Sequence, residues 1–454
     1  MDKTTETTLA LPDGKHVSHI LIADDLTGGN DSGIQFAQSG LEASMLVTPT
    51  MLSAENLVCS PVVPGHGPDI LVLNTDTRNV QVDDVPQRIR DCLNFLCVTG
   101  KPDSGSIVFK KIDSTLRGNL GVEMDVIMDA LGFDLVFFAP SYPQQGRTVR
   151  DGNLLVHGSP VHQTEFAHDP LSPVRDAFIP RLLAAQSRRK SGIIPLNIVE
   201  AGSEVLNASI STLRDEGCSV IIFNAEEQNH LEAIAVAGLA QPVLPLFMGS
   251  AGLAKGLADC LAQAPAATAS ETKETRTFSP QGKSDGRKVV LFVCGSVSQV
   301  TRTQVKKLES TPGVSLFLLP EGELDAAKED ALARSIIQKL DNGPSILATP
   351  ALAYPQGEMC WQEDVTSSLS LVAERILENI AAGPENVILF LTGGDTALAV
   401  LKKLGIIELR LKKELTPGIV LTQVMGGRFN GMAVITKAGG FGEPDALHSL
   451  LSLV

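Results

Sequence analysis

Short apolar runs alternate with longer helical patterns along most of the chain. Each run ends in a turn that contains Gly, Asp or Ser, and a segment with helically spaced apolar residues follows. Continuous apolar strands that alternate with helices are typical of parallel sheets covered on both faces. The pattern therefore predicts an α/β fold with mainly parallel sheets covered by helices. The predicted strands are residues 19–23, 70–74, 107–112, 135–139, 220–224, 289–294, 346–348, 387–391 and 419–424.

The segments between these runs carry the 3.6-residue period of helices. In residues 250–262, for example, Ala251, Ala254, Ala258 and Leu261 recur at helical spacing. The predicted helices are residues 84–98, 119–131, 203–216, 250–262, 298–309, 364–381 and 394–404.

Two stretches interrupt the alternation. Residues 263–287 contain almost no large apolar residue, which is typical of a linker. The chain of 454 residues is also longer than a single hydrophobic core usually requires, which favours two domains. We therefore predict a domain at 1–262, a linker at 263–287 and a second domain at 288–454, with the active site in the cleft between the domains. Residues 141–180, rich in Pro and His, are predicted as an irregular segment that covers a site.

Composition narrows the class of protein. A net charge of −15 argues against nucleic acid or an anionic membrane as partner, and 4% aromatic residues argue against stacking platforms for nucleic acid. No apolar stretch reaches the length of a membrane span, and the polar start lacks a signal-peptide core, so we expect a cytoplasmic protein. Seven scattered cysteines without a CxxC pair favour reduced thiols. The oligomeric state stays open, with a homo-oligomer as one option.

Two adjacent carboxylates end the first predicted strand, where open α/β sheets bind ligands. Asp24 and Asp25 could serve as general base, hydroxyl ligand or Mg²⁺ ligand, or one of them could cap the next helix. Thr27 is a plausible cap for the same helix. Asp31, in the first helical turn, is predicted as a surface acid favoured by the helix dipole.

Cationic and hydroxyl side chains follow the next two strands of this half. Arginine forks and small hydroxyls suit a substrate with a carboxylate and several alcohols, because Arg binds a carboxylate bidentately while Asp and Ser order hydroxyls. A structural Asp–Arg pair is the alternative. The candidate substrate-binding residues are Asp24, Arg78, Lys111, Asp113, Ser114, Thr115 and Arg117.

Three glycine-containing turns follow strands in the other half, at 294–298, 392–396 and 437–442. Glycines let backbone N–H groups converge, and a helix N-terminus carries partial positive charge, so the three turns together predict a phosphate-binding surface. A tight βα turn is the alternative for any one of them. Asp395 adds a carboxylate where a metal ion or an attacking hydroxyl could sit. The candidate nucleotide-binding residues are Ser296, Ser298, Gly393, Gly394, Asp395, Thr396, Gly439 and Gly440.

Other motifs exclude common alternatives. The chain lacks a P-loop, a dinucleotide fingerprint opening a βαβ unit and the protein-kinase motifs, so a nucleotide must bind by a less common arrangement. His157, His162 and His168 are spaced by five and six residues, which does not stack them on a helix face, and no acidic partner completes a metal pattern. These histidines are therefore predicted to face the substrate or to be satisfied within the fold, and the ligands of Mg²⁺ stay open.

Six motifs in order across nearly the whole chain resemble the four-carbon acid sugar kinase family. The motifs are ADDLTG at 23–28, KIDSTLRGN at 111–119, GSAGL at 249–253, GSVS at 295–298, TGGDT at 392–396 and KAGGFG at 437–442. The resemblance implies an N-terminal sugar-acid-binding domain, a C-terminal nucleotide-binding domain, and phosphorylation of the 4-hydroxyl of a tetronate by ATP in carbohydrate-acid catabolism. It implies that Asp24, Asp25, Arg78 and residues 111–115 hold the acid, while Ser296, residues 393–396 and Gly440 hold ATP.

The expected reaction is phosphoryl transfer from MgATP to a primary alcohol, with ATP and Mg²⁺ as cofactors. Asp25 or Asp24 is the expected base, and Asp395 is expected on the phosphate and metal side. The form of the 111–117 motif favours D-threonate or D-erythronate over 3-oxotetronate. Two other classes stay open: an NAD(P)-dependent hydroxy-acid dehydrogenase, disfavoured by the missing fingerprint, and a non-catalytic sugar-acid-binding protein, which would leave the phosphate turns unexplained.

Overall fold

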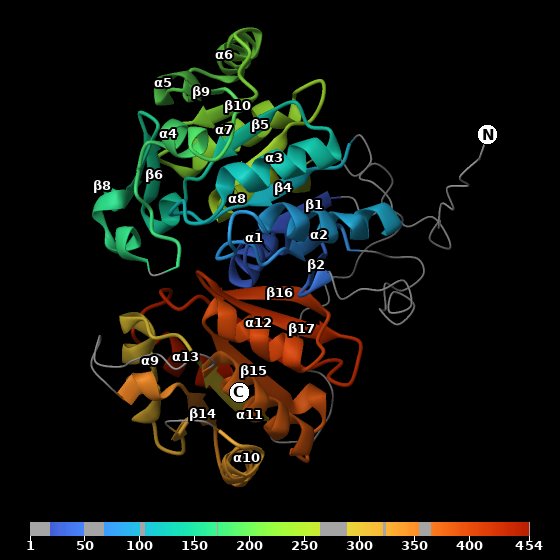
Figure 1. The fold of residues 1–454 in the computed structure, drawn as a ribbon, viewed down its shortest axis with the longest axis vertical. Helices are drawn as coiled ribbons and strands as arrows, with labels where there is room; N and C mark the ends of the chain where they lie inside the picture. Colours follow the sequence, from blue (N-terminus) through green and yellow to red (C-terminus); the bar gives the residue numbers. More distant parts are fainter. Residues whose placement is uncertain are drawn as a thin grey trace, which may run out of the picture.

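The structure is a computed structural model that describes residues 19–49, 68–99, 105–169, 171–263, 288–320, 324–353 and 365–453. Figure 1 shows two α/β halves stacked end to end, the N-terminal half in blue to yellow-green and the C-terminal half in orange to red. The predicted linker at 263–287 lies outside the described residues except for Gln263, which ends a helix. In the part of the chain that is described, no helix is both long and apolar enough to cross a membrane.

The N-terminal half is built on a run of parallel strands. Neighbouring strands pair in parallel throughout this half, as the continuous apolar runs predicted. Its strands, in spatial order, are β2 (Ala43–Leu46), β3 (Ile70–Asn74), β1 (His19–Ala23), β4 (Val108–Lys111), β11 (Leu246–Gly249), β5 (Val136–Ala139), β10 (Val220–Phe223) and β9 (Ser191–Ile194).

The C-terminal half begins with parallel strands and ends with antiparallel ones. The parallel part is β13 (Ser315–Leu318), β14 (Ser345–Ala348), β12 (Val289–Cys294), β15 (Val387–Thr392) and β18 (Ala433–Lys437). Strands β17 (Ile419–Met425) and β16 (Glu408–Thr416) then continue the sheet in antiparallel pairing.

The two halves share one sheet, a connection that the sequence pattern did not predict. Strand β16 pairs antiparallel with β2, opposing Glu408 to Leu46 and Arg410 to Ser44, so a 15-stranded sheet crosses the boundary (Figure 1). Pairing satisfies backbone groups that two open sheet edges would otherwise leave exposed. The sequence pattern missed both strands because β2 is short and β16 mixes charged with apolar residues.

Each predicted helix is present, with ends shifted by at most a few residues. They are α2 (Val85–Thr99), α3 (Leu120–Leu131), α6 (Ser203–Asp215), α8 (Ala251–Gln263), α9 (Gln299–Glu309), α11 (Val365–Asn379) and α12 (Gly394–Lys403). Further α-helices are α1 (Leu26–Gln38), α4 (Ile179–Ala184), α5 (Leu196–Val199), α7 (Gln228–Leu239), α10 (Ala326–Leu340) and α13 (Ala446–Ser449).

Helix α1 lies against both halves at the boundary (Figure 1). A methyl group on Gly33 of this helix would lie 3.0 Å from the Leu411 side chain on β16. The small residue therefore lets α1 pack closely on the strand that joins the halves.

The segment 141–180 is more regular than predicted. It forms a small antiparallel sheet of β6 (Arg147–Arg150), β7 (Asn153–Val156) and β8 (Ser159–Pro160), followed by the 3₁₀ turns η3 (Val161–Gln163) and η4 (Glu165–His168). These strands were not predicted because they are short and lie between proline and glycine turns, whereas the prediction relied on long apolar runs. Cys92, Cys218, Cys260 and Cys294 are free thiols, in line with the reduced state expected from the sequence.

Candidate active site

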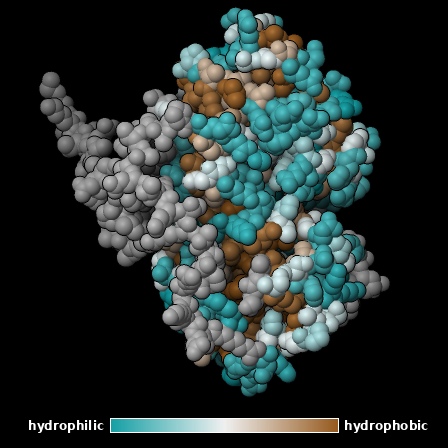
Figure 2. Space-filling view, turned by 180° about the vertical axis from the view of Figure 1, so that it is seen from behind, coloured by the Kyte–Doolittle hydropathy of each residue, from teal (hydrophilic) through white to brown (hydrophobic). Residues whose placement is uncertain are grey.

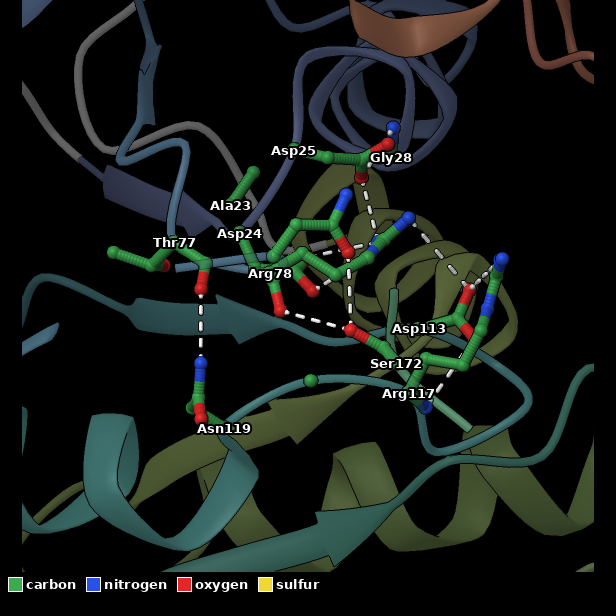
Figure 3. A network of polar contacts seen from close by, with 12 residues as sticks. Ala23, Asp24, Asp25, Gly28, Thr77, Arg78, Asp113, Arg117, Asn119 and Ser172 are labelled. Atoms are coloured by element: carbon green, nitrogen blue, oxygen red, sulfur yellow. Dashed lines mark hydrogen bonds and ion pairs between the residues drawn. The ribbon is translucent and has the colours of Figure 1, made fainter. Parts of the chain in front are cut away.

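The carboxyl ends of three neighbouring strands bring the predicted acidic and basic residues together. Strand β1 lies between β3 and β4, so Asp24 after β1, Arg78 beyond β3 and Lys111 at the end of β4 meet at one edge. Figure 3 shows Arg78 at the centre of this network, with Asp24 and Asp25 directed toward its guanidinium.

Asp24 and Arg78 form a buried, bidentate ion pair. Arg78 Nε donates to Asp24 Oδ2 at 2.8 Å and Nη2 donates to Oδ1 at 3.0 Å. Burial alone would raise the pKa of Asp24, but the charges of Arg78 and Lys110 outweigh it and hold this pKa below its usual value. Asp24 therefore stays ionised and fixes the arginine.

Asp25 also contacts Arg78 and begins helix α1. Its Oδ1 accepts from Arg78 Nη2 at 2.6 Å and from the backbone N–H of Gly28 at 3.0 Å. Thr27, the predicted cap, lies inside the helix instead and donates to Asp25 Oδ2 at 2.6 Å, because Asp25 holds the extended backbone of an N-cap. The Asp25 side chain is 18% exposed to solvent, whereas the Asp24 side chain is only 1% exposed. Of the two carboxylates, Asp25 is the one a ligand can reach.

The Lys111–Arg117 segment folds around Asp113. Arg117 donates to this carboxylate through Nε at 2.8 Å and Nη2 at 3.0 Å, and to Asp169 through Nη1 at 3.0 Å. The backbone and hydroxyl of Thr115 also donate to Asp113, and Ser114 is buried in the same turn. These contacts hold the pKa of Asp113 well below its usual value despite burial, with Arg117 as the largest opposing charge.

Both arginines predicted to bind a substrate carboxylate are thus already paired with aspartates. Arg78 contacts Asp24 and Asp25, and its Nη1 lies 3.9 Å from Asp113. Asp–Arg ion pairs are therefore present at Arg78 and Arg117, and substrate binding by either arginine stays a prediction.

Lys111 and Asp31 complete the surroundings of Asp25. A methyl group on Gly28 would lie 2.7 Å from Lys111 Nζ, so the amine reaches the start of α1. Asp31 is not the surface acid that was predicted, because its Oδ1 is shielded from solvent and burial raises its pKa to about 7. The carboxylate of Glu414, on the other half, adds to this shift, while Lys111 opposes it.

A second ion pair lies behind this edge. Lys110 Nζ lies 2.6 Å from Glu123 Oε2, and both side chains have 0% exposure. Burial raises the pKa of Glu123, and the nearby Asp24 adds to that shift against the charge of Lys110. The pair therefore connects the core of the N-terminal half electrostatically to Asp24.

The three glycine turns of the C-terminal half converge at the carboxyl ends of β12, β15 and β18. Ser298 Oγ donates to the Gly439 carbonyl at 2.6 Å, which joins the first turn to the third. A methyl group on Gly295 would collide with the Thr396 hydroxyl, and one on Gly393 would lie 3.3 Å from the backbone nitrogen of Ser296. Gly393 has φ +98°, a conformation that favours glycine. Around Gly440 a methyl group would meet nothing within 4 Å, so space remains beside the turns.

Lys437 hydrogen-bonds the backbone of the third turn. Its Nζ donates to the carbonyls of Ala438 at 3.0 Å, Gly439 at 3.1 Å and Phe441 at 3.0 Å. The residue is fully buried, and burial lowers its pKa to about 8. The KAGGFG motif contains Lys437, but the sequence predicted no role for it; the available signal was a lysine two residues before a Gly-Gly pair at the end of a strand.

The start of helix α12 faces the start of α1 across the boundary. A methyl group on Gly394 would lie 3.5 Å from Thr27 Oγ1 and 3.6 Å from Asp25 Oδ2. Asp395 lies in the first turn of α12, and part of its side chain is exposed to solvent. The part that is shielded from water, and then the charges of Asp76 and Asp25, raise its pKa. Lys402 at the other end of α12 pairs with Asp76 at 3.3 Å. The glycine turn at 393–396 therefore lies beside the accessible carboxylate of the N-terminal half.

Among the described residues, no group of three His, Cys, Asp or Glu side chains is arranged to hold a metal ion. His157 lies in the turn between β7 and β8, and its backbone N–H donates to the Gly146 carbonyl at 2.8 Å. His162 and His168 lie in the following 3₁₀ turns, η3 and η4.

Two family models match the chain, one in each half. The sugar-binding N-terminal domain matches residues 19–257, and the nucleotide-binding C-terminal domain matches residues 291–447. A D-threonate kinase from Salmonella typhimurium is 31% identical over 95% of this chain and 97% of its own length. A D-erythronate kinase from Heliobacterium modesticaldum is 29% identical over 94% of both chains, and a 3-oxo-tetronate kinase from Methylobacterium radiotolerans is 27% identical over 95% of this chain and 98% of its own length.

Two solved structures share the fold over at least 95% of this chain. A protein from Salmonella typhimurium described as a putative tRNA synthase superposes with a TM-score of 0.75 at 24% identity, covering 95% of this chain and 98% of its own. A Haemophilus influenzae protein superposes with a TM-score of 0.70 at 22% identity, covering 96% and 99%.

The chain belongs to the four-carbon acid sugar kinase family. It is a phosphotransferase enzyme, and this class replaces the two alternatives, dehydrogenase and non-catalytic binding protein, that the sequence had left open.

Proposed function

We propose that this enzyme transfers the γ-phosphoryl group of ATP to the 4-hydroxyl of a four-carbon sugar acid, with D-threonate or D-erythronate as the favoured substrate. The observation that carries the proposal is the approach of Gly394, at the start of α12, to the accessible carboxylate of Asp25. Phosphoryl transfer needs a phosphate site and a hydroxyl-orienting carboxylate side by side. The names of the relatives support the substrate class.

The nucleotide is assigned to the C-terminal half. The N–H groups of the turns at 295–298 and 393–396, together with the start of α12, would bind the phosphates, since helix N-termini and glycine turns favour anions. Ser296, Ser298, Thr396, Gly439 and Gly440 line the same surface. The domain division 1–262 and 288–454, joined by 263–287, follows from this assignment, with the reaction at the boundary between the domains.

The acid is assigned to the N-terminal half, where Asp25 takes the proton of the 4-hydroxyl. The 4-oxygen forms a bond to the γ-phosphorus as the bond from that phosphorus to the β–γ bridging oxygen breaks, and ADP leaves with that oxygen. Asp24 and Arg78 position Asp25 through the ion pairs described above, while Lys111 and the hydroxyls of Ser114 and Thr115 surround the acid.

Asp395 is the residue we assign to Mg²⁺. Mg²⁺ commonly keeps several waters and takes one or two carboxylates plus substrate phosphates, so it does not require three protein ligands. Burial and then the negative charges of Asp76 and Asp25 raise the pKa of Asp395. A bound cation would relieve this repulsion between carboxylates. When bound, Mg²⁺ neutralises charge on the phosphates.

The test is release of ADP from MgATP with D-threonate, L-threonate, D-erythronate and 3-oxotetronate in parallel. We expect turnover with D-threonate or D-erythronate and a phosphorus NMR signal of a primary phosphate monoester, which reports the 4-position. Turnover only with 3-oxotetronate would overturn the substrate preference, and absence of turnover with all four acids, while ATP still binds, would overturn the proposed substrate class.

A further inference from the structure

A four-carbon acid carries a carboxylate that needs a cationic partner, yet most cations at this edge are already paired. Arg78 is held by Asp24 and Asp25, and Arg117 by Asp113 and Asp169. The neighbouring lysines Lys110 and Lys402 pair with Glu123 and Asp76 in the same way.

Arg147, at the start of β6, differs from these residues. Its Nη1 donates to the carbonyl of Gln145 and lies 3.3 Å from the Gln145 side-chain oxygen, both of which are neutral acceptors. Its Nε is shielded from solvent and has no partner among the described residues. Burial lowers the pKa of Arg147, whereas the pKa values of Arg78 and Arg117 are raised by their carboxylates. Among the described residues no carboxylate forms an ion pair with Arg147, although Asp113 and Glu165 act on its charge from farther away. A partly buried guanidinium whose hydrogen bonds go to neutral acceptors is unfavourable until an anion approaches.

The place of Arg147 suits the far end of a short substrate. Its charge interacts with the carboxylates of Asp113 and Glu165 and with Tyr142 and Arg117. Burial and then the charge of Asp31 raise the pKa of Tyr142, and the carboxylate of Asp31 in turn interacts with Lys111 and Asp25. Arg147 lies at the same edge of the sheet as Lys111, because Tyr142, its backbone partner, follows the end of β5, and only β11 separates β5 from β4. The phosphate turn lies beside Asp25, at the end of the neighbouring strand β1.

The backbone around Arg147 is rigidly held. Tyr142 and Arg147 exchange backbone hydrogen bonds of 2.8 and 3.1 Å, and the Gly146 carbonyl accepts from His157 at 2.8 Å. A guanidinium on a fixed strand loses little freedom when it binds, and its fork matches a carboxylate.

We propose that Arg147 binds the carboxylate of the substrate and makes the enzyme select four-carbon acids over neutral polyols of the same length. This inference rests on the proposed function, because it names the residue that recognises the substrate carboxylate in the same site. In this arrangement the 4-hydroxyl lies at Asp25 and the carboxylate lies at Arg147.

The test compares wild type with Arg147→Met, using the acid that wild type phosphorylates and the corresponding four-carbon polyol. We expect the KM for the acid to rise about 10- to 100-fold, as for loss of a hydrogen bond to a charged group, with the KM for ATP unchanged. The kcat/KM for the polyol should stay unchanged, so discrimination between acid and polyol is lost. An acid KM within about twofold of wild type would overturn the inference.

Arg150→Met is the matched control, because Arg150 lies on the same strand and pairs with Glu226 at the surface. It should leave every constant unchanged. If Arg147→Met lowers the melting temperature strongly, Arg147→Lys replaces it in the test. This variant keeps the positive charge and loses the two-pronged guanidinium. A KM raised only for the acid supports the inference, whereas an unchanged KM for the acid overturns it.

Calorimetric titration with the acids separates this inference from the proposed function. If wild type turns over no acid but binds one, and Arg147→Met loses that binding, the kinase proposal fails and the inference stands. Equal binding by both proteins, or no binding by wild type, overturns the inference.

Discussion

The two sides of the candidate active site use different parts of the polypeptide. On the N-terminal side, charged side chains interlock: Arg78 alone contacts three aspartates. On the C-terminal side, the surface is mostly backbone, shaped by glycines that keep the turns at 295–298 and 393–396 in contact. The first side is sensitive to charge and the second to volume. This contrast fits the proposed assignment, in which the N-terminal side recognises one small acid and the C-terminal side binds a phosphate chain.

The halves also meet differently from two independent domains. The sheet continues through β2 and β16, and α1 packs on both sides of the joint (Figure 1). From behind, Figure 2 shows the outline narrowing between the halves, with hydrophobic residues gathered on the lower half beside that waist. A continuous sheet limits how freely the halves can rotate, so any closure has to bend or twist this joint.

The largest effect is expected where the two sides touch. Asp25→Asn should lower kcat about 100-fold or more, because the variant cannot accept the proton of the hydroxyl. Asn is also a good N-cap, so helix α1 should keep its start. ADP release at saturating acid measures the loss. Asp325→Asn, which changes a cap on α10 far from the site, controls for the cap alone. A kcat for Asp25→Asn near that of wild type would remove the base from the mechanism.

Charge sensitivity of the N-terminal side is tested at the buried Lys110–Glu123 pair. Lys110→Met should destabilise the fold by about 3–5 kcal/mol, because it leaves a carboxylate buried without its partner. The double variant with Glu123→Met should recover much of this loss. Thermal melting reports both. The exposed pair Lys255–Asp259 gives the contrast, since Lys255→Met should cost about 1 kcal/mol or less. Equal losses at the two sites would contradict a charge-dominated N-terminal side.

Volume sensitivity of the C-terminal side is tested by Gly295→Ala. The added methyl group would meet the Thr396 hydroxyl and separate the first two turns. We expect the KM for ATP to rise about 10- to 100-fold through misplacement of the phosphates, with the KM for the acid unchanged. Gly105→Ala is the control, since a methyl group there meets nothing within 4 Å. A selective rise in the KM for the acid would reverse the assignment of the two sides.

The smallest effect concerns pH and the joint between the halves. The pKa of Asp31 rises from 3.8 to about 7 on folding, so the folded protein holds a proton there that the unfolded chain releases. The stability that this proton confers is fully present below about pH 4 and is lost as pH rises through 7. Asp31→Asn should therefore melt about 2 °C or more above wild type at pH 8, with no difference at pH 4.

Glu414→Gln sharpens the same test from the other half. Glu414 adds to the shift of Asp31 from β16, so removing its charge should weaken the pH dependence of the melting temperature. Identical pH profiles for wild type and both variants would show that Asp31 does not titrate at the joint.

Local sequence determined the elements and the chemistry of the turns. Apolar runs such as 289–294 had to become buried strands, and the glycines at 393–394 had to make a tight turn before a helix, because both depend on neighbouring residues only. Six ordered motifs were enough to indicate the family that the comparisons then established.

Tertiary structure alone decided which charges are free. The sequence placed Arg78 and Arg117 at strand ends, but the partners Asp24 and Asp169 lie 54 and 52 residues away in the chain, so these two pairs could not be predicted from spacing. The same holds for the β2–β16 joint and for the shielding of Asp31, which depend on contacts between the two ends of the chain. Short-range patterns specify local conformation, whereas burial and ion pairing depend on which distant segments the folded sheet brings together.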